Sequence, residues 1–261
     1  SGDLKLKLGV GLTEEQRKSL KQPIVWYVKQ DQIVNGKKVT ALVPKVYSPI
    51  TSDFAVQLAG GILSGNNIAI NTDTDVQVGG IMYANGTTSV KARDFNLDTA
   101  QLSTGKLNVK LDRDLNVRSS NINVLDSALI DAGAAVNIEG TQKYERKLAE
   151  IEDGSSLLTK KISYIGSKLN VGKDLAVKTG GNFGVMGSDI TVGGSASFDV
   201  GGDMLLASAE EITASERTKY DRGTWSSTLT KENHYTTTQK GSNLNVGKDL
   251  EINTAKSLTL I

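Results

Sequence analysis

Short apolar–polar–apolar triplets recur along the chain at intervals of about 20 residues, and this period limits the fold more than any other feature. The triplets that begin at Val76, Phe95, Leu115 and Val136 are 19, 20 and 21 residues apart. An apolar residue on each side of a polar one predicts a very short strand with one buried face. Short strands at this period, separated by Gly, Asn and Ser turns without helical segments, predict a parallel β-helix with about three strands per coil.

Two other folds explain the period less well. A leucine-rich repeat has a similar period, but its Leu and Asn consensus does not fit this sequence. A β-sandwich has turns about every 8 to 12 residues and gives no reason for the longer recurrence. Only 5% of the residues are aromatic, while Gly, Ser, Thr and Asn are frequent, which suits many short strands. We expect residues 50–261 to form one elongated solenoid of about seven or eight coils.

Three asparagines occupy the polar centres of successive triplets: Asn96, Asn116 and Asn137. Their flanking residues point inward, so the asparagines point outward and stack on successive coils. Amide side chains stacked about 4.8 Å apart can hydrogen-bond along a ladder, which is one explanation for Asn in a strand. The other explanation is that Asn simply occupies solvated positions.

The stretch GSKLNVGKDL, residues 166–175, resembles at first a loop that holds a nucleotide phosphate. That motif needs four residues between its glycines and a Ser or Thr after the Lys. Here five residues intervene, and Asp174 follows Lys173 with a charge that repels phosphate. The same stretch recurs with one change at residues 241–250. The recurrence predicts a structural repeat rather than a nucleotide site.

Two segments of 25 residues, 141–165 and 216–240, each precede one copy of this motif and each contain a Tyr-acid-Arg triplet. Asp153-Gly154 is a hairpin-turn signal, and we expect both inserts to be long hairpins that project from the stack. The alternative for YERKLAEIE is a short helix. The inserts carry the aromatic residues that are candidates for partner contacts or for packing across the hairpin: Tyr144, Tyr164, Tyr220, Trp225 and Tyr235.

Residues 1–49 have a different pattern. Thr13 and Gln16 have the spacing of a capping box, which predicts a short helix through Lys21 that Pro23 ends. Two apolar stretches around Asn35-Gly36 then predict a β-hairpin with a two-residue turn. The end of a β-helix exposes both core and edge strand, so this helix-plus-hairpin block is a candidate cap or transition segment.

Little in the composition points to catalysis or a cofactor. The chain has no Cys, and His234 is its single histidine, which lies in an insert and is expected to be a surface residue. Carboxylates at Asp112, Asp114, Asp126 and Asp131 would suit a carbohydrate-active enzyme, a polysaccharide lyase or hydrolase on a β-helix scaffold, if they converged in a groove. Asp is also ordinary at coil corners, and we therefore predict no enzyme activity, no metal and no cofactor.

Charge and hydropathy exclude some classes of partner. The charged residues are spread along the chain and give a net charge of only +1, which argues against nucleic acid as a partner. No apolar run approaches the roughly 18 residues of a membrane span, and the N-terminus lacks a hydrophobic signal core. We expect the sequence to be a piece of a longer protein.

The stretch from Leu12 to Tyr47 and the repeated GSxLNVGKDL motif with its inserts resemble the two-partner-secretion exoproteins of Gram-negative bacteria. These include filamentous haemagglutinin-like adhesins and contact-dependent growth inhibition effectors. The resemblance covers nearly the whole chain and implies a right-handed parallel β-helix on the bacterial surface. It also implies secretion through an outer-membrane transporter and a target-cell surface as partner, whether protein, glycan or outer membrane. The implied role is adhesion, or carriage and delivery of a C-terminal toxic domain.

Overall fold

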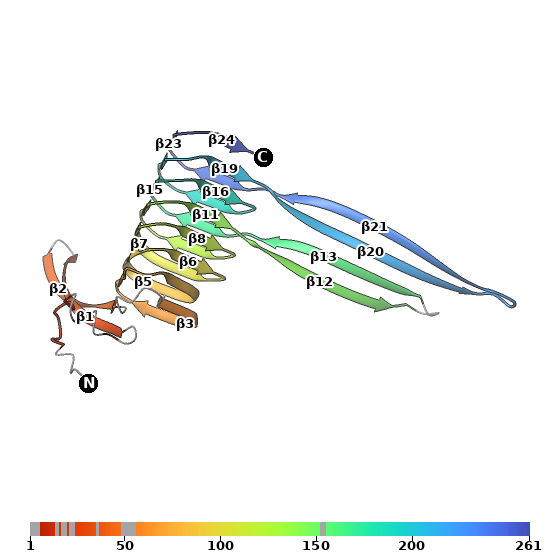
Figure 1. Ribbon diagram of the computed structural model, residues 1–261, viewed down its shortest axis with the longest axis horizontal. Helices are drawn as coiled ribbons and strands as arrows, with labels where there is room; N and C mark the ends of the chain where they lie inside the picture. The colour runs from red at the N-terminus through yellow and green to blue at the C-terminus, as the bar shows by residue number, and fades with distance from the viewer. Residues whose placement is uncertain are drawn as a thin grey trace.

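The computed structural model describes residues 6–13, 16, 20, 24–34, 37–47, 56–151 and 155–261. Its main body is a stack of short parallel strands, and two long hairpins project from one side of that stack (Figure 1). All of the secondary-structure elements in the described residues are strands. The stack is the predicted parallel β-helix.

The strands of the stack form three parallel ladders, which we number in the order that the chain visits them within a coil. Ladder 1 contains the start of β3 (Val56–Gly65), the start of β5 (Val76–Ala92), β6 (Phe95–Asp98), β8 (Leu115–Arg118), β11 (Val136–Glu139), β16 (Phe183–Met186), β19 (Met204–Ala207) and β24 (Leu258–Leu260). Ladder 2 contains the end of β3, the middle of β5, the start of β7 (Gln101–Leu111), β9 (Asn121–Val124), β14 (Lys168–Val171), β17 (Asp189–Val192) and β22 (Asn243–Val246). Ladder 3 contains β4 (Ile68–Asn71), the ends of β5 and β7, β10 (Ala128–Ala132), β15 (Leu175–Thr179), β18 (Ala196–Val200) and β23 (Leu250–Thr254). Seven complete coils and the start of an eighth follow from ladder 1, as the period predicted.

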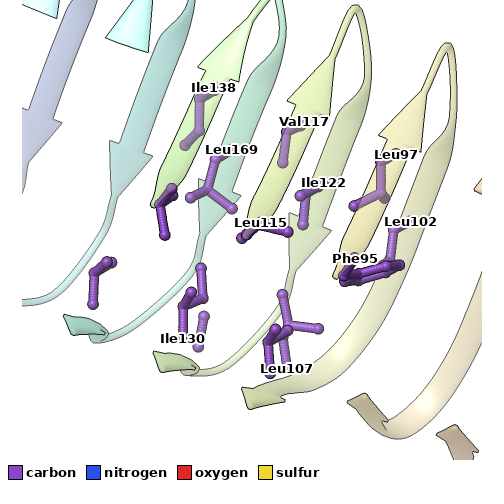
Figure 2. Packing of buried hydrophobic residues seen from close by; sticks show 14 of the residues in the cluster. Phe95, Leu97, Leu102, Leu107, Leu115, Val117, Ile122, Ile130, Ile138 and Leu169 are labelled. Carbon is purple, nitrogen blue, oxygen red and sulfur yellow. The ribbon is translucent and has the colours of Figure 1, made fainter. Parts of the chain in front are cut away.

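The pairing register confirms the triplet spacing. Val76 pairs with Phe95, Phe95 with Leu115, and Leu115 with Val136. Their side chains point into one continuous apolar core, where Leu115 is only 2% exposed. Figure 2 shows this stacking from coil to coil. Because the same face is buried in every coil, hydrophobic burial fixes the register of the whole stack.

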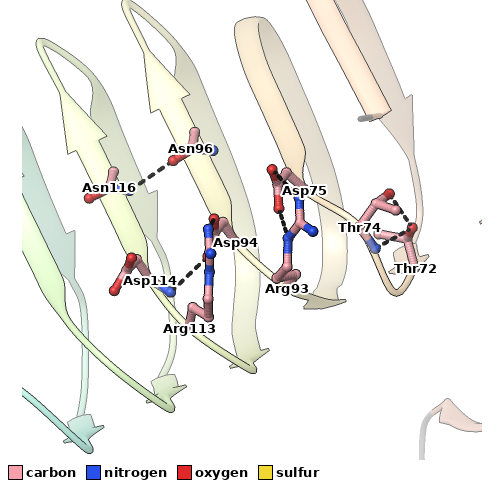
Figure 3. Close-up of polar contacts among 9 residues, drawn as sticks. All are labelled: Thr72, Thr74, Asp75, Arg93, Asp94, Asn96, Arg113, Asp114 and Asn116. Atoms are coloured by element: carbon pink, nitrogen blue, oxygen red, sulfur yellow. Dashed lines mark hydrogen bonds and ion pairs between the residues drawn. The ribbon is translucent and has the colours of Figure 1, made fainter. Parts of the chain in front are cut away.

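The outward-facing asparagines form the predicted ladder. The Asn116 Nδ2 donates to Asn96 Oδ1 at 2.9 Å, and the Asn137 Nδ2 donates to Asn116 Oδ1 at 2.9 Å. The first of these bonds is drawn in Figure 3. The next residue along this ladder is Gly184, which has no side chain to continue it. Amide bonding between coils therefore confirms the ladder over three coils.

A second polar ladder lies at the corner that leads into ladder 1. The Asp94 carboxylate accepts the backbone N–H of Asp114 at 3.1 Å, and Asp114 accepts the N–H of Ala135 at 2.8 Å. Arg113 also forms an ion pair with Asp94 (Figure 3). The hydrogen bond from Arg113 holds the pKa of Asp94 below its usual value. The carboxylates of Asp94 and Asp114 thus link each coil to the next one through hydrogen bonds.

The N-terminal hairpin is confirmed and its helix is not. β1 (Ile24–Val34) and β2 (Lys37–Tyr47) pair antiparallel with Val34 opposite Lys37, and the predicted turn residues 35–36 lie outside the described residues. The end of β2 pairs with β4 through Lys45↔Ala69 and Val46↔Ile70, so the hairpin adds a parallel edge strand to ladder 3.

The predicted helix from Thr13 to Lys21 is not borne out as an element, although Gln16, one of the few described residues of this segment, has a helical backbone. The Thr13 N–H donates to Gln16 Oε1 at 2.9 Å, and the Gln16 N–H donates to Thr13 Oγ1 at 3.2 Å, so the capping box itself is formed. Of the segment 13–21, only residues 13, 16 and 20 are described.

Candidate functional site

The two inserts form one four-stranded antiparallel sheet, which we call the insert sheet. The first hairpin consists of β12 (Thr141–Glu150) and β13 (Ser156–Ile165), and the second of β20 (Ala209–Arg222) and β21 (Ser227–Lys240). β13 pairs with β20, which gives the order β12-β13-β20-β21. The strand β12 excludes the helical alternative for YERKLAEIE.

The hairpin boundaries can be compared with the expected inserts. The first hairpin occupies the expected range 141–165, and its predicted turn at Asp153-Gly154 lies outside the described residues. The second hairpin begins at Ala209, ahead of the expected start at residue 216, and ends at Lys240. The two hairpins are therefore the same kind of element with arms of different length.

Both hairpins leave the stack at the turn between ladder 1 and ladder 2, which we call the insert corner. In three of the uninterrupted coils this corner has one residue with positive φ: Thr99 (56°), Ser119 (46°) or Gly187 (53°). A small buried residue follows it, such as Ser120 or Ser188. In the interrupted coils, residues 140–166 and 208–241 take the place of that single residue. Because both inserts start at the same corner two coils apart, they lie beside each other and pair.

Tyr164 fixes the base of the insert sheet to the stack. It is 7% exposed, its Oη accepts the N–H of Gly140 at 2.7 Å, and its backbone N–H donates to Glu211 Oε1 at 2.9 Å. The Lys240 Nζ donates to the Tyr164 carbonyl at 3.2 Å. Burial raises the pKa of the Tyr164 hydroxyl. These contacts join both hairpins to one coil corner.

Gly187 leaves room for this junction. A Cβ at Gly187 would lie 2.6 Å from the Tyr164 ring and 2.7 Å from the Ala209 Cβ. The equivalent residues Thr99, which has no insert beside it, and Ser119, which has only the first hairpin beside it, do carry side chains. Glycine at this corner is therefore required by the approach of the two hairpins and not only by its positive φ.

The second residue of the recurring motif is a serine that lies at the same corner. The backbone N–H of Ser120 donates to Ser167 Oγ at 3.0 Å, and that of Ser167 donates to Ser188 Oγ at 2.9 Å. The N–H of Ser188 in turn donates to Ser242 Oγ at 3.4 Å. Since these side chains are buried or partly buried, the serine ladder supplies hydrogen bonds between coils where the inserts interrupt the chain.

The GKD part of the motif also joins coils. The Gly172 N–H donates to Val124 O at 2.8 Å, and the Lys173 N–H donates to Asp126 O at 2.8 Å. The Lys173 ammonium lies 3.2 Å from the Asp126 carboxylate. A Cβ at Gly172 would lie 2.3 Å from Leu125 O, so glycine permits close stacking. The amides that a phosphate would need are already bonded to the preceding coil.

The insert sheet is amphipathic. Residues directly opposite one another in antiparallel strands share a face, so the registers place Tyr144 with Ile162 and Ile212, and Ala214 with Tyr235. Besides Tyr164 at its base, the face defined in this way, which we call the apolar face, carries nine apolar or aromatic residues: Tyr144, Leu148, Leu158, Ile162, Ile212, Ala214, Tyr220, Leu229 and Tyr235. The opposite face is mainly Lys, Thr, Glu and Ser. The largest exposures on the apolar face are Tyr144 60%, Leu148 58%, Leu229 59% and Tyr235 64%.

The five aromatic candidates therefore occupy three environments. Tyr144, Tyr220 and Tyr235 share the apolar face, with Tyr220 partly buried. Trp225 lies between β20 and β21 and is 98% exposed. Tyr164 is buried at the junction. The aliphatic members of the apolar face were not identified as candidates from the sequence, because their alignment depends on the pairing of the two hairpins.

The titratable candidates do not form one site. His234 is exposed on the opposite face of the insert sheet, where its Nε2 lies 3.1 Å from Thr236 Oγ1. Asp112 and Asp114 lie at the corner into ladder 1, Asp126 pairs with Lys173 at another corner, and Asp131 lies in β10. Within the described ranges, no group of three or more His, Asp or Glu side chains is arranged to hold a metal ion.

A search of the same described residues finds no helix with the length and apolarity to cross a membrane. The fold and its projecting sheet define a class of protein: a β-helical filament segment with lateral strand inserts.

Comparison with known proteins finds similarity over most of the chain. Residues 121–222 match the family model described as the hemagglutinin repeat. The chain is 29% identical over 217 residues to the tRNA nuclease CdiA of Escherichia coli, which is 81% of this chain and 6% of that protein. It is 25% identical over 225 residues to the tRNA nuclease CdiA of Yersinia mollaretii, covering 82% of this chain and 7% of the relative. A stretch of 47 residues is 53% identical to the protein adenylyltransferase and cysteine protease IbpA of Histophilus somni, which covers 18% of this chain and 1% of IbpA. No solved structure matches the chain.

Residues 121–222 thus match the hemagglutinin repeat, and most of the chain is similar to CdiA proteins, which are contact-dependent growth inhibition effectors. Such exoproteins are surface-exposed or secreted by Gram-negative bacteria in a two-partner secretion context with an outer-membrane transporter. The chain is a stalk segment of a filamentous exoprotein, and it spans only 6% to 7% of the length of the two CdiA relatives.

Proposed function

We propose that this segment is a non-enzymatic β-helical stalk that, in its parent protein, presents a C-terminal effector and helps to deliver it to a target cell. The observation that supports the stalk role most is the unbroken stack of three ladders from β3 to β24. Both inserts leave at a corner and interrupt none of these ladders. The hydrogen bonds of all three ladders run along the filament, which favours a stiff rod over a hinged chain.

The N-terminal block is proposed to cover the first coil. Residues 1–49 are taken as a cap-like or transition segment and residues 50–261 as the solenoid. The pairing of β2 with β4 supports this division, because it supplies an edge strand to the start of ladder 3. An edge strand that is covered in this way is protected from pairing with another chain.

The insert sheet is proposed as the surface that contacts partners. Tyr144, Tyr220 and Tyr235 present aromatic area on one face, and Trp225 is almost fully exposed between β20 and β21. Exposed aromatic residues often dominate interface energies. Contact with a target-cell surface through Trp225 is consistent with its position in the turn of the longer hairpin (Figure 1).

Excision of the inserts from the full-length parent tests this function. The corner geometry allows residues 140–166 and residues 208–241 each to be replaced by a single serine, the residue found at the uninterrupted corner as Ser119. We expect ladders 1 and 2 to be preserved, because the inserts interrupt neither of them and loop closure depends only weakly on length. Secretion should be unchanged, while adhesion or delivery of the effector should fall.

Two results would contradict the proposal. A doubly excised parent with undiminished adhesion and delivery would show that the inserts make no functional contact. An excised chain that is secreted but unfolded would show that the inserts belong to the folding core. The single variant Trp225→Ser, in an exposed turn, separates loss of one contact from loss of the whole sheet.

A further inference from the structure

The apolar face of the insert sheet is uncovered by its own chain. The sheet projects away from the stack, so the β-helix does not form a second layer over it (Figure 1). Four large side chains on this face are more than half exposed: Tyr144, Leu148, Leu229 and Tyr235. An antiparallel sheet with one apolar and one polar face normally buries the apolar face against another layer.

The shape of this face suits a protein layer. Ala214 lies between larger neighbours, and a hollow of about 240 Å³ opens there between Leu158, Lys160 and Tyr235. The neighbouring tyrosine side chains project from the same face. A face that carries both a hollow and projecting aromatic rings has the two complementary features that a self-complementary interface needs.

The size of the face also fits a stable interface between two chains. Two strands of 10 residues and two of 14 residues make up the sheet. At about 3.3 Å per residue and about 4.8 Å between strands, the face measures roughly 750 Å². A standard protein interface buries about 800 Å² per partner, so one face against an identical face reaches that size.

The charges on the apolar face favour a protein over lipid as the occupant. Four cations, Arg146, Lys160, Arg222 and Lys231, accompany three anions, Glu150, Glu210 and Glu216. The near balance allows two copies to meet without net repulsion and permits pairing between opposite charges. Placing seven charged groups against hydrocarbon would instead be costly.

We propose that the apolar face of the insert sheet packs against the same face of a second copy of this chain about a twofold axis. The two sheets then form a sandwich with a spacing of about 10 Å, and neighbouring stalks are joined laterally through their inserts. This inference rests on the proposed use of the insert sheet as a contact surface and names the partner of its apolar face.

Sedimentation velocity of the whole 261-residue chain, up to about 100 µM, tests the proposal. We expect a reversible dimer. The variant Leu148→Glu/Leu229→Glu, at two positions exposed in the single chain, should raise the dimer Kd by at least about 100-fold. The control Thr228→Glu/Thr230→Glu adds the same charge on the opposite face and should leave the Kd unchanged.

A cross-linking experiment identifies which face of the insert sheet forms the contact, and it does not depend on a variant that could unfold the chain. The chain has no Cys, so Ala214→Cys on the apolar face and Thr213→Cys on the opposite face each carry one thiol. A short bis-maleimide should join two copies of Ala214→Cys and should not join Thr213→Cys. Cross-linking of Thr213→Cys alone would place the contact on the wrong face and overturn the proposal.

Three other results overturn the proposal. A chain that is monomeric throughout the concentration range has no such contact, although the stalk role would still stand. A monomer that binds phosphatidylcholine–phosphatidylglycerol vesicles, and loses that binding on Leu148→Glu/Leu229→Glu, has a lipid-facing sheet. A dimer that keeps its Kd in Leu148→Glu/Leu229→Glu is joined through some other surface.

Discussion

Leu115 and Asn116 are neighbours in β8 whose substitution by Asp should have very different effects. Leu115 is 2% exposed and lies in the core between Phe95 and Val136. Truncation of a buried Leu costs about 2 to 5 kcal/mol through lost burial and the cavity that remains. A carboxylate at this position adds the cost of staying protonated at pH 7, about 4 kcal/mol if its pKa rises by roughly three units. We therefore expect Leu115→Asp to lower the free energy of unfolding by at least about 5 kcal/mol.

Asn116→Asp should cost far less. Its side chain faces outward and donates one hydrogen bond, from Nδ2 to Asn96 Oδ1. The substitution removes this donor but keeps an oxygen that can accept from Asn137 Nδ2. The loss of one partly exposed amide bond corresponds to about 1 kcal/mol.

Urea denaturation followed by far-ultraviolet circular dichroism measures both variants against the parent chain. A solenoid unfolds as a sum of repeat and interface contributions, so the slope m must be compared along with the midpoint. A smaller m for Leu115→Asp would show that one coil is already open, which is still consistent with a buried Leu115. Equal loss of stability in the two variants would refute the inward register of ladder 1 and therefore the assignment of the coils.

Three further substitutions test the corners and the recurring motif. Gly187→Ala should lower the free energy of unfolding by about 1 to 3 kcal/mol, because its Cβ would meet the Tyr164 ring. The loss should be smaller when Tyr164→Ala is combined with it, and strictly additive effects on the urea midpoint would contradict the contact. The pKa of Asp94 is lowered in the folded state, so its stabilising effect is present above the unfolded pKa of about 4 and is lost as the pH falls through the folded value. Asp94→Asn should accordingly be less stable than the parent at pH 7 but lose less stability on acidification, and parallel pH profiles of the urea midpoint would exclude this effect. Lys173→Ala and Lys248→Ala should leave the fold intact, and neither the variants nor the parent chain should bind ATP in calorimetry; saturable binding that Lys173→Ala abolishes would restore the phosphate-loop interpretation of the motif.

The solenoid could be predicted because its period is repeated in every coil. Phe95, Leu115 and Val136 satisfy the same inward position, and a shift by one residue would turn all of them outward. The Asn ladder followed from the same register, since each Asn is the centre of a triplet. The first hairpin could also be predicted from the sequence, because a turn signal lies between two arms of similar length.

The pairing of the two inserts could not be predicted from the sequence. It depends on both hairpins leaving at one corner, and that corner has no characteristic residue type, since it is formed by Thr99, Ser119 or Gly187 in different coils. The apolar face could not be predicted from the sequence either, because Leu148 and Leu229 are seen to share a face only once the pairing of β13 with β20 is known. The serines that bond coil to coil resemble ordinary turn residues until their side chains are seen to be buried.

The insert corner explains how a stalk can carry a lateral sheet without losing stiffness. A segment inserted within a ladder strand would break inter-coil hydrogen bonds and expose the core. A segment that replaces one corner residue keeps those hydrogen bonds and leaves the core covered. The N–H of Ser119, at the uninterrupted corner, donates to Glu139 O on the next coil, immediately before the first insert begins. On the far side of that insert, the Lys168 N–H donates back to Ser120 O. The stack is therefore closed on both sides of the excursion, and changes in the inserts can alter lateral contacts while the core of the filament remains the same.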